Sequence, residues 1–410
     1  MSEQKQHGKD GHPPIADNFL LQLLRRTPDN IYFKDAAGRF LLISDAMARY
    51  CHYADPADAR GKTDFDIFSE EHAQQAYEDE QSILKTGTPI IGKEEKETWP
   101  DGHETWVSTS KEPLFDDEGS IIGTFGISRD ITARKEAEAR ATRYAERLKA
   151  ANDGMLADLA LAGDLQTALL PGEYPVFPPG TNPEHSTLRF AHVYEPSQTV
   201  SGDLFSVHPQ SDTEAFIFIS DGIGHGVRAA LLASMLSALL RDRIRADHSP
   251  AECLARLDRS LRAILKAQED VLFATAFCLT VNAGNGEVTY ANAGHLSPLI
   301  LRGGSGTVEP LETGDKSSGP ALGLMENATF RSGTARLYPG DRMILFTDGL
   351  IEAVDARSEP FGEQRLASCL KQYADHSPAE MLAHALETAR AFGGGRYFED
   401  DVCAVCVERN

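Results

Sequence analysis

The chain has 410 residues, with 40 basic and 62 acidic side chains and a formal net charge of −22. This length fits two domains, each large enough to bury its own core. The acidic balance, without a local basic cluster, argues against nucleic acid or anionic lipid as a partner.

The N-terminal segment, residues 1–14, is polar and rich in turn-forming residues, and it lacks the apolar core of a signal peptide. The longest apolar stretch, residues 229–240, is too short to span a bilayer. We therefore expect a disordered tail, a cytoplasmic location and no contact with a membrane.

Residues 15–131 predict a small antiparallel sheet that carries helices. Two strands flank a glycine turn near residues 34–44, a helix covers about 69–87, and three alternating segments are separated by PDG and DDEG turns. The stretches YFKDAAGRFLLIS, GKTDFDIF and DGHETWVSTSKEPLFDDEGSIIGTFGISRDIT together resemble a PAS sensor domain. The resemblance implies a domain that reads a ligand or partner. Cys51, His52 and His72 offer possible haem ligands, but we expect ordinary side chains there, and the sequence indicates no particular ligand.

Residues 132–170 are rich in Ala, Glu, Arg and Leu and contain no proline, which predicts a long helix. Its apolar residues are spaced by four and three, which is the seam of a coiled coil and favours a homodimer. Near the end two spacings of four follow each other, which resembles a stutter. A single surface helix with an apolar stripe is the alternative. The seam residues are Ala137, Ala141, Tyr144, Leu148, Ala151, Met155 and Leu159.

A proline-rich stretch after Pro171 ends this helix and opens a second domain, residues 171–410. Many apolar strands occur there together with helices in pairs, which start after Gly226 and Pro250 and near Glu363 and Pro378. This pattern predicts a layered α+β fold.

Carboxylates mark three strand ends in the second domain. Asp221 and Asp348 each end a strand and precede a glycine, whereas the pair Asp400 and Asp401 starts a strand. An antiparallel arrangement would gather them at one edge, where their mutual repulsion requires a cation. Oxygen ligands without His or Cys suit Mg²⁺ or Mn²⁺. Two such ions would favour hydrolysis of a phosphate ester; one Asp-Gly turn alone would be weak support.

The motifs SGDLFSV, ISDGIGHGVRAALLASML, YANAGHLSPLIL, ALGL, GDRMILFTDGLIEA and FEDDVCAVCV occur in the order seen in bacterial PPM-type serine/threonine phosphatases. They resemble most the branch of the sporulation stage II phosphatase and the sigma-factor regulators. The resemblance spans about residues 159–408 and implies an αββα sandwich with two Mn²⁺ or Mg²⁺ ions. It also implies a substrate, a phosphorylated anti-sigma-factor antagonist of STAS type.

Matching motif positions assign roles to six residues. The resemblance implies that Asp221 bridges both metals and that the carbonyl of Gly222 binds one of them. Asp348 and Asp400 would be further metal ligands, and Asp203 would lie near the metal-bound water. Asp401 would either bind a metal itself or support a neighbouring residue that does.

The sequence departs from the family pattern at Ser201, where glycine is usual, at Ser206, where aspartate is common, and at Cys403, where threonine is usual. None of these changes removes a predicted ligand, so we expect a phosphatase that is active but slow. The alternative is a degenerate, non-catalytic phosphatase fold that acts as a binding module controlled by the PAS domain.

Five further residues invite a chemical role that we do not favour. His225 could act as a general acid, but its glycine neighbours favour a role in the turn. For His295 we expect a structural role, and for Arg228 solvent exposure rather than phosphate binding. Cys403 and Cys406 share a C-x-x-C spacing, yet residues three apart on a strand face opposite sides, which favours core packing over zinc binding.

Overall fold

The computed structural model describes residues 15–243, 249–266, 272–312 and 318–410. The predicted disordered tail, residues 1–14, lies outside the described residues. The chain divides into two compact units, Met1–Ala151 and Asn152–Asn410. In the described part, no helix has both the length and the apolar character needed to cross a bilayer.

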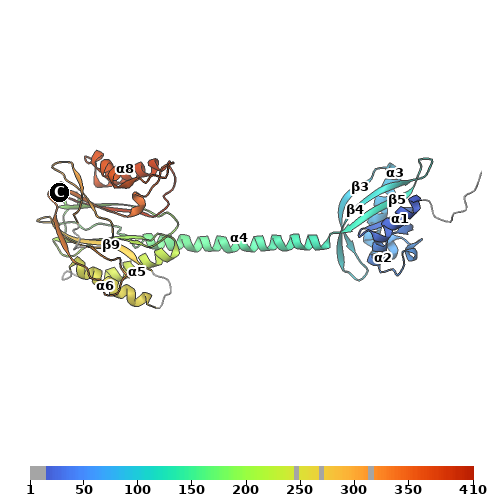
Figure 1. Ribbon diagram of the computed structural model, residues 1–410, viewed down its shortest axis with the longest axis horizontal. Helices are drawn as coiled ribbons and strands as arrows, with labels where there is room; N and C mark the ends of the chain where they lie inside the picture. The colour runs from blue at the N-terminus through green and yellow to red at the C-terminus, as the bar shows by residue number, and fades with distance from the viewer. Residues whose placement is uncertain (1–14, 244–248, 267–271, 313–317) are drawn as a thin grey trace, which may run out of the picture. The chain divides into compact units, whose positions relative to one another are not determined.

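The first unit contains one antiparallel sheet with the strand order β2-β1-β5-β4-β3. Its helices α1, α2 and α3 are labelled in Figure 1. This arrangement confirms the predicted PAS-like sheet with helices. The elements are α1 (Ile15–Arg26), β1 (Asn30–Asp35), β2 (Phe40–Ile43), α2 (Asp45–Tyr50), α3 (Glu70–Thr86), β3 (Ile90–Thr98), β4 (Glu104–Phe115) and β5 (Ile121–Asp130).

The interior of this unit contains several charged side chains. Lys34, which is 1% exposed, forms ion pairs with Asp64 and with Glu80, the latter at 2.6 Å. The carboxylate of Glu97 is also buried, and it accepts hydrogen bonds from Tyr50 at 2.5 Å and from Thr105 at 3.0 Å. Burial raises the pKa of Glu97 to about 7 despite these hydrogen bonds.

A single helix, α4 (Thr132–Thr167), covers most of the predicted linker. Its apolar seam is uncovered: Tyr144, Leu148 and Met155 are 70%, 73% and 61% exposed. Gln166 is its one buried residue. The predicted helix is therefore present, and the coiled coil stays a prediction.

The second unit has two sheets, ordered β13-β10-β9-β8-β7, with β14 beside β10, and β12-β11-β15-β16-β6. Its strands are β6 (Leu188–Glu195), β7 (Asp203–Pro209), β8 (Glu214–Gly222), β9 (Ala274–Asn282), β10 (Glu287–Ala293), β11 (Leu299–Leu301), β12 (Val308–Pro310), β13 (Ser318–Gly319), β14 (Gly333–Arg336), β15 (Arg342–Phe346) and β16 (Val402–Arg409). Its helices are α5 (Val227–Arg243), α6 (Pro250–Leu265), α7 (Gly362–Gln372) and α8 (Pro378–Phe392).

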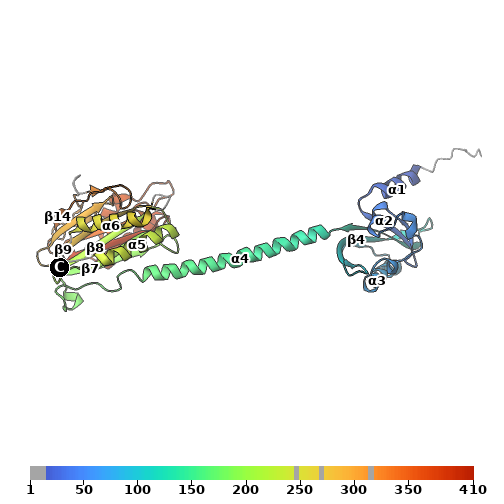
Figure 2. The same cartoon turned by 90° about the horizontal axis from the view of Figure 1, so that it is seen from below.

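The four layers follow from how the central strands are buried. On β8, Ile217 and Ile219 face the core between the sheets, whereas Phe216 and Phe218 pack against α5 and α6. A strand covered on both faces reads as a continuous apolar run, which is why AFIFIS lacks alternation. Figures 1 and 2 show α5 and α6 over the sheet of β7, β8 and β9, and α8 on the other side of the sandwich. The predicted αββα sandwich is confirmed.

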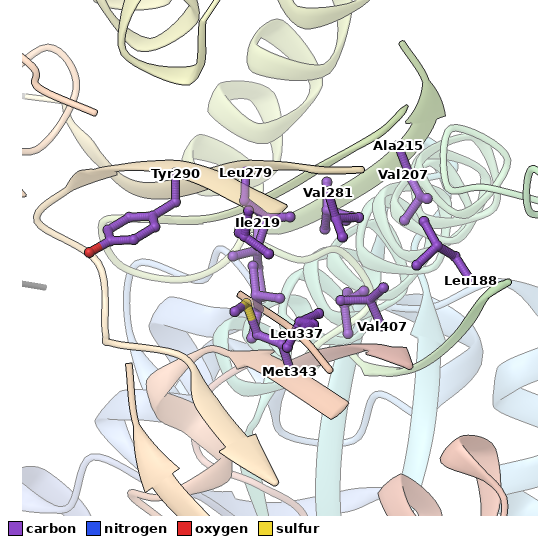
Figure 3. Close-up of a cluster of buried hydrophobic side chains, with 14 of the residues drawn as sticks. Leu188, Val207, Ala215, Ile219, Leu279, Val281, Tyr290, Leu337, Met343 and Val407 are labelled. Atoms are coloured by element: carbon purple, nitrogen blue, oxygen red, sulfur yellow. The ribbon is translucent and has the colours of Figure 1, made fainter. Parts of the chain in front are cut away.

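The core between the two sheets holds both together. Figure 3 shows Ile219, Leu279 and Val281 from one sheet above Met343 and Val407 from the other. Burial of one such aliphatic side chain contributes about 1.5–3 kcal/mol.

Strand β16 shows the same two-sided burial as β8. Cys403 faces the core between the sheets, and Cys406 faces the cluster under α7 and α8. The two thiols therefore point to opposite faces, which confirms core packing for this C-x-x-C spacing.

Candidate metal centre

In the second unit, two aspartates from neighbouring strands face each other at one edge of the sheet that contains β7, β8 and β9. Asp203 opens β7, and its residue partner in the antiparallel ladder is Asp221 near the end of β8. The next ladder partner of Asp221, on β9, is Thr275. Asp203 is 2% exposed, while Asp221 is half-buried.

The second sheet brings its carboxylates to the same side. Strands β15 and β16 are antiparallel, so Asp348, just after β15, lies beside Asp400 and Asp401, just before β16. Gly349 makes this approach possible, because a Cβ atom at this position would lie 2.1 Å from the carbonyl oxygen of Asp401.

The electrostatics show that the two groups of carboxylates interact. Burial, followed by the charges of Asp348, Asp400, Asp401 and Glu352, raises the pKa of Asp221 to about 7. The pKa of Asp348 is likewise raised, by burial and then by Glu352 and Asp400. Such mutual repulsion favours the binding of a cation.

Asp203 lies in the most strongly perturbed environment of the group. Burial raises its pKa well above the ordinary value, and the charge of Asp221 raises it further. The hydroxyl of Thr347 opposes this by donating a hydrogen bond of 2.7 Å to Oδ2 of Asp203.

Asp401 uses both carboxylate oxygens within the protein. Oδ1 accepts hydrogen bonds from the backbone N–H and the hydroxyl of Ser197 at 2.7 and 2.9 Å. Oδ2 accepts one from the N–H of Gly202 at 2.7 Å. These contacts suit a residue that holds the loop before Asp203 better than one that binds a metal directly.

The donor set fits a hard divalent cation, because it consists of carboxylate and carbonyl oxygens. Among the residues that the structure describes, however, no three His, Cys, Asp or Glu side chains converge closely enough to hold a metal together. Asp203, Asp221, Asp348 and Asp400 thus line one edge and interact through their charges, and their roles as ligands, with that of the Gly222 carbonyl, stay predictions.

Two further residues of this edge, Glu352 and Thr347, were not predicted from the sequence. Glu352 lies four residues after Asp348, and its N–H donates to the carbonyl oxygen of Asp348 at 2.8 Å. Its position in FTDGLIEA, one turn beyond the aspartate, was the available signal. Thr347 carried no signal, because its contact with Asp203 joins residues that are 144 positions apart.

The departures from the family pattern have local explanations. Ser201 is fully buried, and its hydroxyl accepts a hydrogen bond from the N–H of Asp203 at 3.0 Å. The hydroxyl of Ser206 lies 2.5 Å from Nε2 of His208. Each serine therefore has a local hydrogen-bond partner.

The remaining candidates lie around this edge. His225 is exposed in the turn before α5, 2.8 Å from the side-chain amide of Gln198, and Arg228 is exposed in the first turn of α5. His295 is buried, its Nδ1 lies 2.8 Å from the hydroxyl of Thr275, and burial lowers its pKa to about 4. Thr275 is the ladder partner of Asp221 on β9. A neutral His295 next to Thr275 agrees with a structural role.

The loop before Asp203 is also attached to the end of α4. The side-chain amide of Gln166 donates to the carbonyl oxygen of Ser201 at 2.6 Å and accepts from its N–H at 2.9 Å. One turn earlier, a Cβ atom at Gly163 would lie 2.3 Å from the carbonyl oxygen of Thr199. The last turns of α4 therefore pack directly on the backbone that leads to the carboxylates.

Comparisons with known proteins agree with this architecture. Residues 211–410 match the model of the family "Stage II sporulation protein E (SpoIIE)", and residues 24–136 match the model of the PAS fold. The phosphoserine phosphatase RsbP of Bacillus subtilis is 27% identical over 216 residues, which cover 52% of this chain and 51% of RsbP. The phosphoserine phosphatase RsbU of the same organism is 28% identical over 197 residues, which cover 48% of this chain and 53% of RsbU. The chain thus spans about half the length of these relatives.

Among solved structures, the SiaA-PP2C domain of Pseudomonas aeruginosa is similar, with a TM-score of 0.53 and 23% identity. The match covers 64% of this chain and 99% of the SiaA-PP2C chain. At this identity the likeness shows the fold alone.

Proposed function

Because the chain joins a PAS domain to a PP2C domain of SpoIIE type, we propose that it is a metal-dependent protein serine/threonine phosphatase whose activity is set by the PAS domain. The observation that carries this proposal is the meeting of carboxylates from both sheets at one edge, with Asp203 opposite Asp221 and Asp348 beside Asp400. The similarity to RsbP and RsbU supports phosphoserine as the residue whose phosphate ester bond is hydrolysed.

The residues of this edge have distinct tasks in the proposal. Asp221, Asp348, Asp400 and the Gly222 carbonyl would hold two Mn²⁺ or Mg²⁺ ions, with Asp203 beside them. Bound ions of this kind supply an activated water and charge stabilisation for a phosphoryl group. Asp401 keeps the loop of Ser197 to Gly202 in place, so that Asp203 stays next to Asp221.

We further propose a serine-phosphorylated STAS-domain protein as the substrate, in a partner-switching pathway that controls a sigma factor. The support is the similarity to the sigma-factor-regulator branch, which the order of motifs also indicates. The negative charge of the chain, −22, agrees with a protein partner rather than nucleic acid.

The proposed route of regulation is α4. Within the first unit, Arg134 and Lys135 form ion pairs with Glu94 of β3 at 2.5 Å, which fastens the first turn of α4 to the PAS sheet. Within the second unit, Gln166 binds Ser201. A second copy of α4 would cover the exposed seam of Tyr144, Leu148 and Met155, which supports a homodimer.

The test is phosphate release from a serine-phosphorylated STAS-domain protein by the full chain, with Mn²⁺ or with EDTA. We expect hydrolysis that requires the metal. The rival, a non-catalytic binding module, is favoured by one observation: no three metal-binding side chains converge within the described residues. Binding of the phosphoprotein in calorimetry without any hydrolysis would establish the rival and refute the proposed activity.

A further inference from the structure

A buried threonine links the carboxylates of the two sheets. Thr347 lies between β15 and Asp348, and it is 0% exposed. Its hydroxyl donates to Oδ2 of Asp203 on β7, in the other sheet, at 2.7 Å. The Oγ1 atom of Thr347 also accepts a hydrogen bond from the backbone N–H of Cys403 at 2.9 Å. Thr347 therefore contacts β7 and β16 while its backbone continues into Asp348.

The direction of the hydroxyl follows from its surroundings. A threonine hydroxyl has one hydrogen to donate, and the N–H of Cys403 already occupies an acceptor position of the oxygen. The carboxylate of Asp203 is the nearest acceptor, since the carbonyl oxygens of Cys403 and Asp401 lie farther away, at 3.3 and 3.5 Å. When Asp203 is ionised, a hydrogen bond to its carboxylate is also stronger than one to a neutral carbonyl.

Asp203 depends on this donor. It is buried opposite Asp221, a residue of the same charge, and none of the ion pairs in the described part of the chain includes it. Without the hydroxyl, repulsion from Asp221 would be free to turn the carboxylate of Asp203 away from the edge.

We propose that Thr347 is a positioning residue of the metal centre, which holds the carboxylate of Asp203 at a fixed place relative to Asp348 and so joins the two sheets across the site. This inference rests on the proposed function, because it assumes that this edge binds divalent metal. It adds a residue that contacts no metal itself and acts through Asp203.

The experiment measures Mn²⁺ affinity of the full chain by calorimetry, together with kcat for phosphate release. The variant Thr347→Val removes the hydroxyl at nearly constant shape, and Thr347→Ser restores it. Thr280→Val is the control: this threonine of β9 is 9% exposed, and its hydroxyl bonds Gln210 at 2.7 Å, away from the carboxylates. Thr347→Ala replaces the valine variant if that variant does not fold.

We expect Thr347→Val to weaken Mn²⁺ binding by about tenfold or more, with Thr347→Ser within about threefold of the natural chain and Thr280→Val unchanged. In an Asp203→Asn background, Thr347→Val should add little, because both changes act on the same carboxylate.

Unchanged Mn²⁺ affinity in Thr347→Val, or an equal loss in Thr280→Val, would overturn the inference. If the natural chain binds Mn²⁺ but hydrolyses nothing, the proposed function fails, while the affinities still decide the role of Thr347. If the natural chain binds no Mn²⁺, both proposals fail.

Discussion

Asp203 and Asp221 are direct partners in the antiparallel ladder of β7 and β8, so two carboxylates lie face to face at the edge of one sheet. Like charges directly opposite each other destabilise a sheet. A chain that keeps such a pair, with further carboxylates beside it, loses stability at this edge in the absence of a cation. We therefore expect Mn²⁺ to raise the midpoint of thermal unfolding of the second unit.

The ligand assignment is tested most directly at Asp348. We expect Asp348→Asn to lower kcat for phosphate release by about a hundredfold or more, because an amide is a weak substitute for a carboxylate on a hard cation. The assay uses the full chain with saturating Mn²⁺. Glu387→Gln, a neutralised and exposed acid on α8, is the matched control and should retain activity. An Asp348→Asn variant with the natural kcat would remove Asp348 from the site.

Asp401 should matter for stability as well as for activity. Asp401→Ala removes the acceptor for three hydrogen bonds, from Ser197 and Gly202, and we expect a loss of about 2–4 kcal/mol in the free energy of unfolding. Urea unfolding followed by far-ultraviolet circular dichroism measures this loss. Asp400→Asn should cost much less stability, because its side chain is half-buried and accepts one hydrogen bond from the N–H of Asp401. Equal losses in the two variants would contradict the role we assign to Asp401.

Gln166 provides a test of communication through α4. Gln166→Glu keeps an acceptor for the N–H of Ser201 but loses the donor to its carbonyl oxygen. We expect a loss of about 1–2 kcal/mol in stability and a change of at least threefold in kcat. Thr167→Val, which removes a hydroxyl bonded within α4 itself, should leave kcat unchanged. If both variants keep the natural kcat, the attachment of α4 to Ser201 does not influence the site.

The PAS domain should lose stability as the pH rises. The pKa of Glu97 is raised to about 7 in the folded state from an ordinary value of 4.5. Below pH 4.5 the carboxyl is protonated in both states; between 4.5 and 7 only the unfolded state ionises, so the free energy of unfolding falls, and above 7 the loss is complete. The full effect is on the order of 3 kcal/mol.

Glu97→Gln should remove most of this pH dependence. The chain has two tryptophans, Trp99 and Trp106, and both lie in the first unit. Tryptophan fluorescence during urea unfolding at pH 5 and pH 8 therefore reports the PAS domain alone. An unchanged difference between the two pH values in Glu97→Gln would assign the effect to other groups.

The sequence by itself determined the two domains, the long helix and most strands and helices of the second unit, because apolar periodicity, glycine turns and proline breaks are local signals. The order of the aspartate motifs likewise identified Asp221, Asp348 and Asp400 as candidates. Strand β7 was not among the predicted strands, although the short apolar run after Asp203 belongs to it.

Only the tertiary structure decided which side chains meet. Periodicity shows which face of a strand is buried, but not which residue of another sheet lies against it. The hydrogen bond from Thr347 to Asp203 spans 144 positions, and that from Ser197 to Asp401 spans 204. The first depends on the packing of two sheets around one core, and the second on the pairing of β6 with β16 within one sheet. The sequence gives the order of the carboxylates along the chain, but not the hydroxyl and N–H groups that lie against them.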